Sequence, residues 1–174
     1  FDVDITTVTD VSYNIMEDTL RFFMTINEAQ LRVGDAVDDC IDEEILDNLK
    51  SFGIGTIELG VQSTDDEVLR LSERRHTRED VFKASELIRS YGINLGLQMM
   101  TNLPGSSNEL DIETAKKIVS LSPDGVRIYP TVVIRDTALE SLWRCGKYAP
   151  KTPEDAAKLG AELIAIFEEK NIPI

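Results

Sequence analysis

Cysteine is too scarce in this sequence to build either a disulfide scaffold or a metal site made of cysteine alone. The 174 residues contain two, Cys40 and Cys145, whereas disulfide-rich domains use several pairs and structural zinc sites use four ligands. We interpret both as isolated buried thiols, because unpaired cysteine is among the most frequently buried residue types.

Long apolar runs and basic residues are also lacking. No run approaches the roughly 20 apolar residues of a membrane helix, and the opening FDVDITTVTD has neither the basic nor the apolar region of an export signal. We therefore expect a cytoplasmic protein. Lys and Arg total 18 against 32 Asp and Glu, and the net charge of -14 repels the phosphates of nucleic acids unless basic residues cluster locally.

The signature motifs of several common enzyme classes are missing as well. The sequence contains no Walker motif, GxGxxG, HExxH or GxSxG. Their absence argues against the usual phosphate-binding, dinucleotide-binding, zinc-protease and serine-hydrolase classes.

What is present from residue 41 onward is an alternation of helical and strand patterns. Apolar strands begin roughly 30 to 40 residues apart, which is typical of βα units whose crossovers are helices. We predict an α/β fold with a parallel-stranded partial (βα) barrel, because 174 residues are few for eight units. The predicted helices are 42–51, 65–71, one opened by a Thr77/Asp80 capping box, 108–121, 137–145 and 153–170, and the predicted strands are 54–61, 93–100 and 126–130.

The first 40 residues have a less regular pattern. Residues 7–23 have the spacing of a capped amphipathic helix, and residues 31–40 have neither a strand pattern nor a clear turn. We expect residues 1–40 to be a discontinuous remnant of the N-terminal part of the barrel and residues 41–174 to be its C-terminal part.

Polar residues interrupt the predicted strands near their C-terminal ends. Glu58 and Gln62 flank the end of the first strand, Gln98 lies in the second, and Arg127 and Tyr129 alternate with apolar neighbours in the third. The carboxyl ends of parallel strands form the ligand site in α/β folds, so these side chains are candidates for it. The alternative is that they are hydrogen-bonded core residues.

A basic group, Arg74, Arg75 and His76, follows the short helix at 65–71. It suits a carboxylate or phosphate, and a solvated turn is an equal alternative. His76, the only histidine, is a weak candidate for a general base. Gly105 in LPGSS suits either a close backbone approach to a ligand or a simple turn.

Three segments resemble radical-SAM enzymes: TIELGVQSTDDEVLRLSERRHTREDV, LGLQMMTNLPGSSNELDIETAKKI and VRIYPTVVIRDTALESLWRCGKY. The sequence is most similar to the radical-SAM domain of the Elongator catalytic subunit and its bacterial relatives, and more distantly to oxygen-independent coproporphyrinogen oxidase. The resemblance implies S-adenosylmethionine and a four-iron four-sulfur cluster as cofactors, with cleavage to a 5′-deoxyadenosyl radical that acts on a substrate. It also implies an electron donor such as flavodoxin or ferredoxin.

The resemblance assigns roles to four of the candidate residues on the cofactor side. Gln62 and Gln98 match residues that hydrogen-bond the ribose of S-adenosylmethionine, and Arg74 matches an arginine that pairs with its carboxylate. Glu58 would lie near its amino group. Amides suit hydroxyls, and a guanidinium grips a carboxylate with two parallel hydrogen bonds.

On the substrate side, the resemblance places Arg127 and Tyr129. The substrate is not defined by the sequence: a small molecule or a peptide fits the composition, and the net charge of -14 disfavours tRNA, which an Elongator-like protein would otherwise suggest.

The sequence departs from the family at the cluster itself. The CxxxCxxC loop that supplies three thiolate ligands is absent, and Asn102 and Arg75 replace two usual glycines. Either the protein is a cluster-free, non-catalytic α/β binding or scaffold protein, or it is longer than these 174 residues and its cluster loop lies upstream of Phe1. We favour the second alternative, in which Cys40 and Cys145 are not cluster ligands.

Overall fold

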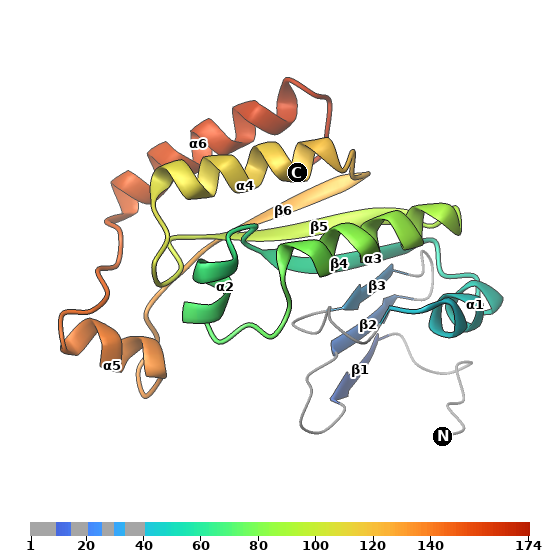
Figure 1. The fold of residues 1–174 in the computed structure, drawn as a ribbon, viewed down its shortest axis with the longest axis horizontal. Helices are drawn as coiled ribbons and strands as arrows, with labels where there is room; N and C mark the ends of the chain where they lie inside the picture. Colours follow the sequence, from blue (N-terminus) through green and yellow to red (C-terminus); the bar gives the residue numbers. More distant parts are fainter. Residues whose placement is uncertain (1–9, 15–20, 26–29, 34–40) are drawn as a thin grey trace.

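The computed structural model describes residues 10–14, 21–25, 30–33 and 41–174, the first three ranges as backbone only. Helices and strands alternate from α1 onward (Figure 1), as the sequence predicts. In chain order the elements are β1 (Asp10–Asn14), β2 (Arg21–Thr25), β3 (Gln30–Val33), α1 (Glu43–Ser51), β4 (Thr56–Gln62), α2 (Asp66–Leu71), α3 (Arg78–Ser90), β5 (Asn94–Thr101), α4 (Asn108–Ser120), β6 (Gly125–Pro130), α5 (Ala138–Arg144) and α6 (Pro153–Glu168).

The main sheet is parallel and has the strand order β3-β4-β5-β6. Glu58 lies opposite Gly96 in the register, and Gln98 lies opposite Arg127. Beyond β6, the Val126 amide donates to the Pro173 carbonyl at 2.8 Å, so the last residues continue the pairing of the sheet. The predicted α/β fold with a parallel sheet is confirmed.

The predicted helix over residues 7–23 is wrong. The structure has strands β1 and β2 in this range, paired antiparallel with Val11 opposite Met24 and Tyr13 opposite Phe22. Aromatic and β-branched residues favour strands when a partner strand is available, and that pairing outweighs a helical spacing. Residues 15–20 lie outside the described residues. Strand β3 was not predicted either. It overlaps residues 31–40, for which the sequence showed no strand pattern, and its four residues are too few for a clear alternation of apolar and polar side chains.

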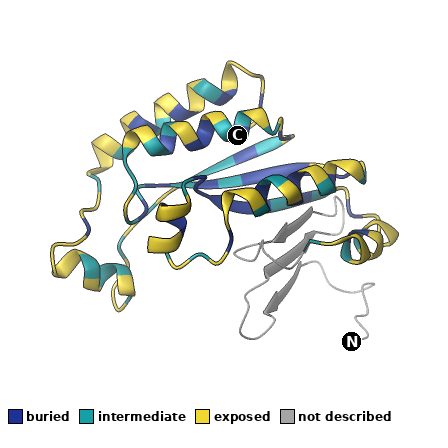
Figure 2. Cartoon of the chain, in the orientation of Figure 1, coloured by how far each residue is buried: buried dark blue, intermediate teal, exposed yellow. Residues whose placement is uncertain are grey.

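Helices α3, α4 and α6 cover one face of the sheet, and α4 and α6 run side by side (Figure 1). Residues that alternate along the strands are buried, as Figure 2 shows, and they form one core cluster with residues of these helices. The core therefore uses one of the two side-chain sets of each strand, which leaves the other set for the opposite face. The buried strand residues are Ile57, Leu59, Val61, Leu95, Leu97, Met99 and Val126.

The helices begin and end where the sequence predicts. Thr77 and Asp80 form the expected capping box, in which the Thr77 amide donates to Asp80 Oδ2 at 2.8 Å. Gly53 and Gly92, which follow α1 and α3, have φ of +73° and +69°, as expected for glycines that end helices.

Cys145 is exposed at the C-cap of α5, so the interpretation of a buried thiol is wrong for this residue. The reason is that α5 buries none of its residues. Cys40 lies outside the described residues. Among the helices that the structure describes, none is both long enough and apolar enough to span a bilayer.

Two glycines are expected to respond in opposite directions to replacement by alanine. At Gly160, inside α6, an added Cβ meets no atom within 4 Å, whereas at Gly105 φ is +82° and the Cβ lies 2.5 Å from Leu71 Cδ1. Gly160→Ala should raise the free energy of unfolding by about 0.5–1 kcal/mol. Gly105→Ala should lower it by about 1–3 kcal/mol. Urea denaturation measures the free energy of unfolding of both variants. Equal changes in the two variants would contradict the positive φ assigned to Gly105.

Candidate functional site

A cavity of about 520 Å³ opens at the C-terminal ends of β4, β5 and β6. Its walls come from these strand ends, from the residues after α2, from the loop after β5, and from the segment 129–142 that leads into α5. Four of the six predicted site residues line it: Gln62, Arg74, Gln98 and Tyr129.

Gln62 is the most informative residue of this cavity. Its side chain is fully buried, and neither its amide nitrogen nor its amide oxygen forms a hydrogen bond with any residue that the structure describes. A buried amide without partners costs roughly 1–3 kcal/mol, so native proteins seldom keep one unless a ligand or water satisfies it. Gln62 therefore offers both amide atoms, without a partner among the described residues, at the wall of the cavity.

The backbone at Gln62 forms a tight turn that sets the direction of its side chain. Gln62 has φ of +59°, and the Ser63 amide donates to the Val61 carbonyl at 2.7 Å across it, which makes a tight γ-turn. The next residue is anchored, because the Thr64 amide donates to Thr114 Oγ1 of α4 at 3.1 Å. The register with β5 also shifts at this point. Such local strain is common where a side chain serves a site.

Arg74, Gln98 and Tyr129 approach the cavity from three different elements. Arg74 follows α2 and is partly buried, and its amide donates to the Leu69 carbonyl at 2.9 Å. Gln98 is partly buried in β5, and Tyr129, at the end of β6, is 41% exposed. The cavity therefore combines a guanidinium and two amides with an aromatic ring near its opening.

Glu58 and Arg127 lie together elsewhere. Both line a second cavity of about 400 Å³ nearer the N-terminal ends of the strands, where Arg127 Nε is 3.3 Å from Glu58 Oε2. The pair spans β5, and a Cβ at Gly96 between them would lie 3.2 Å from Glu58 Cγ. Glycine at this position thus leaves room for the ion pair. The structure does not place Glu58 or Arg127 in the lining of the cavity that holds Gln62.

His76 does not line either cavity. Its ring is 3% exposed, and Nε2 lies 3.2 Å from the Val61 carbonyl. This contact supports a structural role for His76, close beneath the Gln62 turn.

The loop after β5 is held by a hydrogen-bond network that the sequence did not reveal. Tyr148 Oη donates to the Asn102 carbonyl at 2.9 Å and accepts from Asn102 Nδ2 at 2.8 Å. The Asn102 amide donates to Asp111 Oδ2 at 2.9 Å, and Ser106 Oγ donates to Asp111 Oδ1 at 2.5 Å. Leu103 and Pro104 of this loop line the larger cavity. The network therefore fixes one wall of the site.

Both acidic groups of this network are affected by burial. Burial raises the pKa of the Asp111 carboxyl, while the hydrogen bonds from Ser106 and the Asn102 amide act in the opposite direction. Burial also raises the pKa of the Tyr148 hydroxyl. The one sequence signal for the network was Asn102, which the family resemblance places at a usual glycine. In the structure Asn102 has φ of +58°, a conformation that glycine adopts most easily.

The fold and the larger cavity define a class of protein: a parallel βα half-barrel with a cavity at the C-terminal ends of its strands, where α/β proteins of this kind bind their ligands. Residues 9–118 match the Radical SAM superfamily and residues 123–174 match the Radical_SAM C-terminal domain. The chain belongs to the radical SAM superfamily. The cofactors of that family are S-adenosylmethionine and a four-iron four-sulfur cluster, so the expected cofactors are confirmed at the family level.

Curated relatives make the resemblance to Elongator specific. The chain is 36% identical over 149 residues to a tRNA uridine(34) acetyltransferase of Dehalococcoides mccartyi, covering 81% of this chain and 32% of that protein. It is 35% identical over 132 residues to human Elongator complex protein 3, covering 74% of this chain and 24% of that protein. The chain thus spans about a third or less of the length of these relatives.

Comparison with solved structures supports the same family. The archaeal Methanocaldococcus infernus Elp3 superimposes with a TM-score of 0.68 at 34% identity, covering 77% of this chain and 31% of that one. Coproporphyrinogen III oxidase of Escherichia coli gives a TM-score of 0.64 at 22% identity, over 82% of this chain and 32% of that one. The second match shows a shared fold.

Removing the Tyr148 hydroxyl tests the network. Tyr148→Phe deletes two hydrogen bonds of a phenol that is 8% exposed, so the free energy of unfolding should fall by about 1–2 kcal/mol. Tyr91→Phe is the matched control, because Tyr91 Oη donates to the distant Glu43 carbonyl at an exposed site and its loss should change nothing measurable. Chemical denaturation gives the free energy of unfolding of both variants. If Tyr148→Phe is as stable as Tyr91→Phe, the stabilising role given to the network is wrong.

Proposed function

We propose that this chain is the S-adenosylmethionine-binding half of a radical SAM enzyme, and that the cavity lined by Gln62, Arg74 and Gln98 is its cofactor site. The observation that carries the proposal is the buried Gln62 amide, whose nitrogen and oxygen have no partner among the described residues. Ribose hydroxyls can donate to the amide oxygen and accept from the amide nitrogen.

The other residues of the cavity supply complementary chemistry. Gln98 offers a second amide for the ribose, and the Arg74 guanidinium can pair with the methionine carboxylate through two hydrogen bonds. When bound and reductively cleaved, S-adenosylmethionine supplies a 5′-deoxyadenosyl radical that abstracts hydrogen from a substrate. The chain's own residues hold and orient the cofactor at the strand ends.

The described residues do not supply the cluster. No group of three His, Cys, Asp or Glu among them could hold a metal ion, so we derive no step through the cluster. We propose that its cysteine ligands lie outside these 174 residues, that residues 1–40 belong to the N-terminal part of the barrel, and that 41–174 form the C-terminal part. An electron donor of the flavodoxin or ferredoxin type would supply the electron.

The resemblance places Glu58 near the amino group of S-adenosylmethionine, but we leave Glu58 out of the proposed cofactor site because it lines the other cavity. In the structure its carboxylate pairs with Arg127, on the same face of the sheet but in the other cavity. Tyr129, at the cavity opening, is the better placed of the two proposed substrate-side residues.

For the substrate we propose tRNA in the cytoplasm, which reverses the expectation drawn from net charge. The matched relatives of the chain include three that are named tRNA uridine(34) acetyltransferases. The charge is also unevenly spread along the sequence: residues 69–78 and 129–151, which include the cavity walls outside β4, β5 and the loop after β5, carry eight Lys and Arg against three Asp and Glu, while the rest carries ten against 29. Of these eight, Arg74 lines the cavity itself, and Arg70 and Arg144 pair with Glu67 and Glu140. A basic border on an acidic protein can attract RNA phosphates locally, which the total charge conceals.

Cofactor binding should depend on Gln62 and not on Glu58. Gln62→Ala removes both unpartnered amide atoms and should weaken S-adenosylmethionine binding about tenfold, equivalent to about 1.4 kcal/mol. Glu58→Gln is nearly isosteric and lies in the other cavity, so it should leave affinity unchanged. Calorimetric titration measures both. Loss of affinity in Glu58→Gln alone would move the cofactor site to the second cavity.

The enzyme proposal itself is tested on the protein expressed from its full natural reading frame. After anaerobic treatment with iron and sulfide, it should show cluster absorbance and release 5′-deoxyadenosine from S-adenosylmethionine on reduction. If neither is observed, the cluster-free binding or scaffold protein is the correct alternative.

A further inference from the structure

The segment that closes the larger cavity carries an unusual group of exposed apolar side chains. We name Tyr129, Val132, Ile134 and Trp143 the rim. They are 41%, 67%, 62% and 48% exposed, and the first three line the cavity. Large apolar side chains gathered at one opening are a feature of binding surfaces.

Trp143 lies at the outer border of this opening. Leu139 and Leu142 of α5 line the cavity, and Trp143 follows Leu139 by four residues, one helical turn along the same side. No residue of α5 is buried, so the Trp143 indole is exposed to solvent beside the cavity.

The element that carries Trp143 is nonetheless held in place. The Lys147 and Tyr148 amides both donate to the Leu142 carbonyl, at 2.9 and 3.2 Å, and Tyr148 is bonded to Asn102 of the β5 loop. At the other end of α5, Thr137 Oγ1 donates to the Ile134 carbonyl at 2.7 Å, a bond within the segment that leads into the helix. A surface helix that is tied to the fold on its C-terminal side presents its side chains to a partner at low entropic cost.

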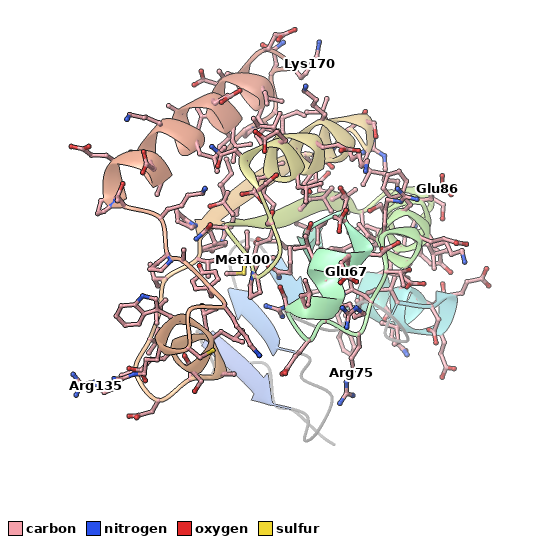
Figure 3. The ribbon with its side chains drawn as sticks, turned by 60° about the vertical axis from the view of Figure 1, so that its left-hand side comes forward. Glu67, Arg75, Glu86, Met100, Arg135 and Lys170 are labelled. Atoms are coloured by element: carbon pink, nitrogen blue, oxygen red, sulfur yellow. The ribbon has the colours of Figure 1, made fainter. Side chains whose placement is uncertain are left out.

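Two basic residues, Arg135 and Lys147, lie close to the rim in the sequence. Arg135 immediately follows Ile134, and Lys147 follows α5. In Figure 3, Arg135 extends outward from the ribbon on the side of α5. An exposed indole among cations matches unpaired nucleotides, whose bases stack on aromatic rings while their phosphates contact Arg and Lys. A duplex hides its base faces and offers no such stacking.

We propose that Trp143 stacks on an unpaired base of the RNA substrate next to the cavity opening, with Arg135 contacting an adjoining phosphate. The inference rests on the proposed RNA substrate and deepens it: the RNA is recognised through a single-stranded segment, one base outside the nucleotide that enters the cavity.

The test uses Trp143 itself, because it is the only tryptophan of the chain and stacking on a base quenches indole fluorescence. The chain is titrated with a labelled RNA hairpin that has an unpaired loop, and with a blunt duplex of the same length. We expect quenching by the hairpin and little by the duplex. By anisotropy, Trp143→Ala should bind the hairpin about tenfold more weakly, as loss of one base stack predicts, and Trp143→Phe should fall between.

Phe52→Ala is the matched control. Phe52 is a 62% exposed aromatic residue at the C-cap of α1, at the opposite end of the molecule from α5 in Figure 1, and its loss should leave hairpin affinity unchanged. S-adenosylmethionine titration of each variant reports whether the cavity is intact.

The other outcomes overturn the inference in distinguishable ways. Hairpin binding without quenching, or with full affinity in Trp143→Ala, leaves the RNA substrate standing and removes Trp143 from its recognition. Equal quenching by the duplex contradicts a single-stranded segment. Absence of any RNA binding while S-adenosylmethionine still binds contradicts the RNA substrate as well. Quenching that grows with protein concentration without RNA would assign the rim to a protein partner.

Discussion

The parallel pairing of β4, β5 and β6 is the constraint on which the rest of the structure depends. It brings the carboxyl ends of all three strands to one edge, and it separates each strand's side chains into two sets. One set packs under α3, α4 and α6. The other set is left to face the cavities, which is why Gln62, Gln98 and Tyr129 meet although they are far apart in the sequence.

The second set is not uniform along the strands. Near the N-terminal ends, Glu58 and Arg127 neutralise each other over Gly96, whereas near the C-terminal ends Gln62 has no partner among the described residues. Paired charges stabilise a face, and an unpartnered amide costs free energy that a ligand can recover. The ion pair and the unpartnered amide thus lie at opposite ends of the same face of the sheet. The Asn102–Tyr148 bonds connect the loop after β5 to the segment that follows α5.

Sequence patterns predicted the helices and strands after residue 41 because caps, glycines and apolar runs act locally: Thr77, Gly53 and Gly92 mark helix boundaries on their own. They failed for β1 and β2, whose pairing is a tertiary contact. The same limit applies to the site. Gln62, Arg74 and Gln98 were recognised from strand ends and resemblance, but the Glu58–Arg127 pair and the bond from Tyr148 to Asn102 join residues more than 40 positions apart, and single-sequence patterns carry no information on such contacts.

The central claim is that the cavity at the strand ends, and not the one around Glu58, receives S-adenosylmethionine. Side-chain amide resonances resolve the two directly, since Gln62 and Gln98 line the first cavity and Asn94 lines the second. In a nuclear magnetic resonance titration, the Gln62 and Gln98 amide signals should shift together and saturate at one cofactor concentration while the Asn94 signal stays in place. A shift of Asn94 with Gln62 and Gln98 unchanged would contradict the account.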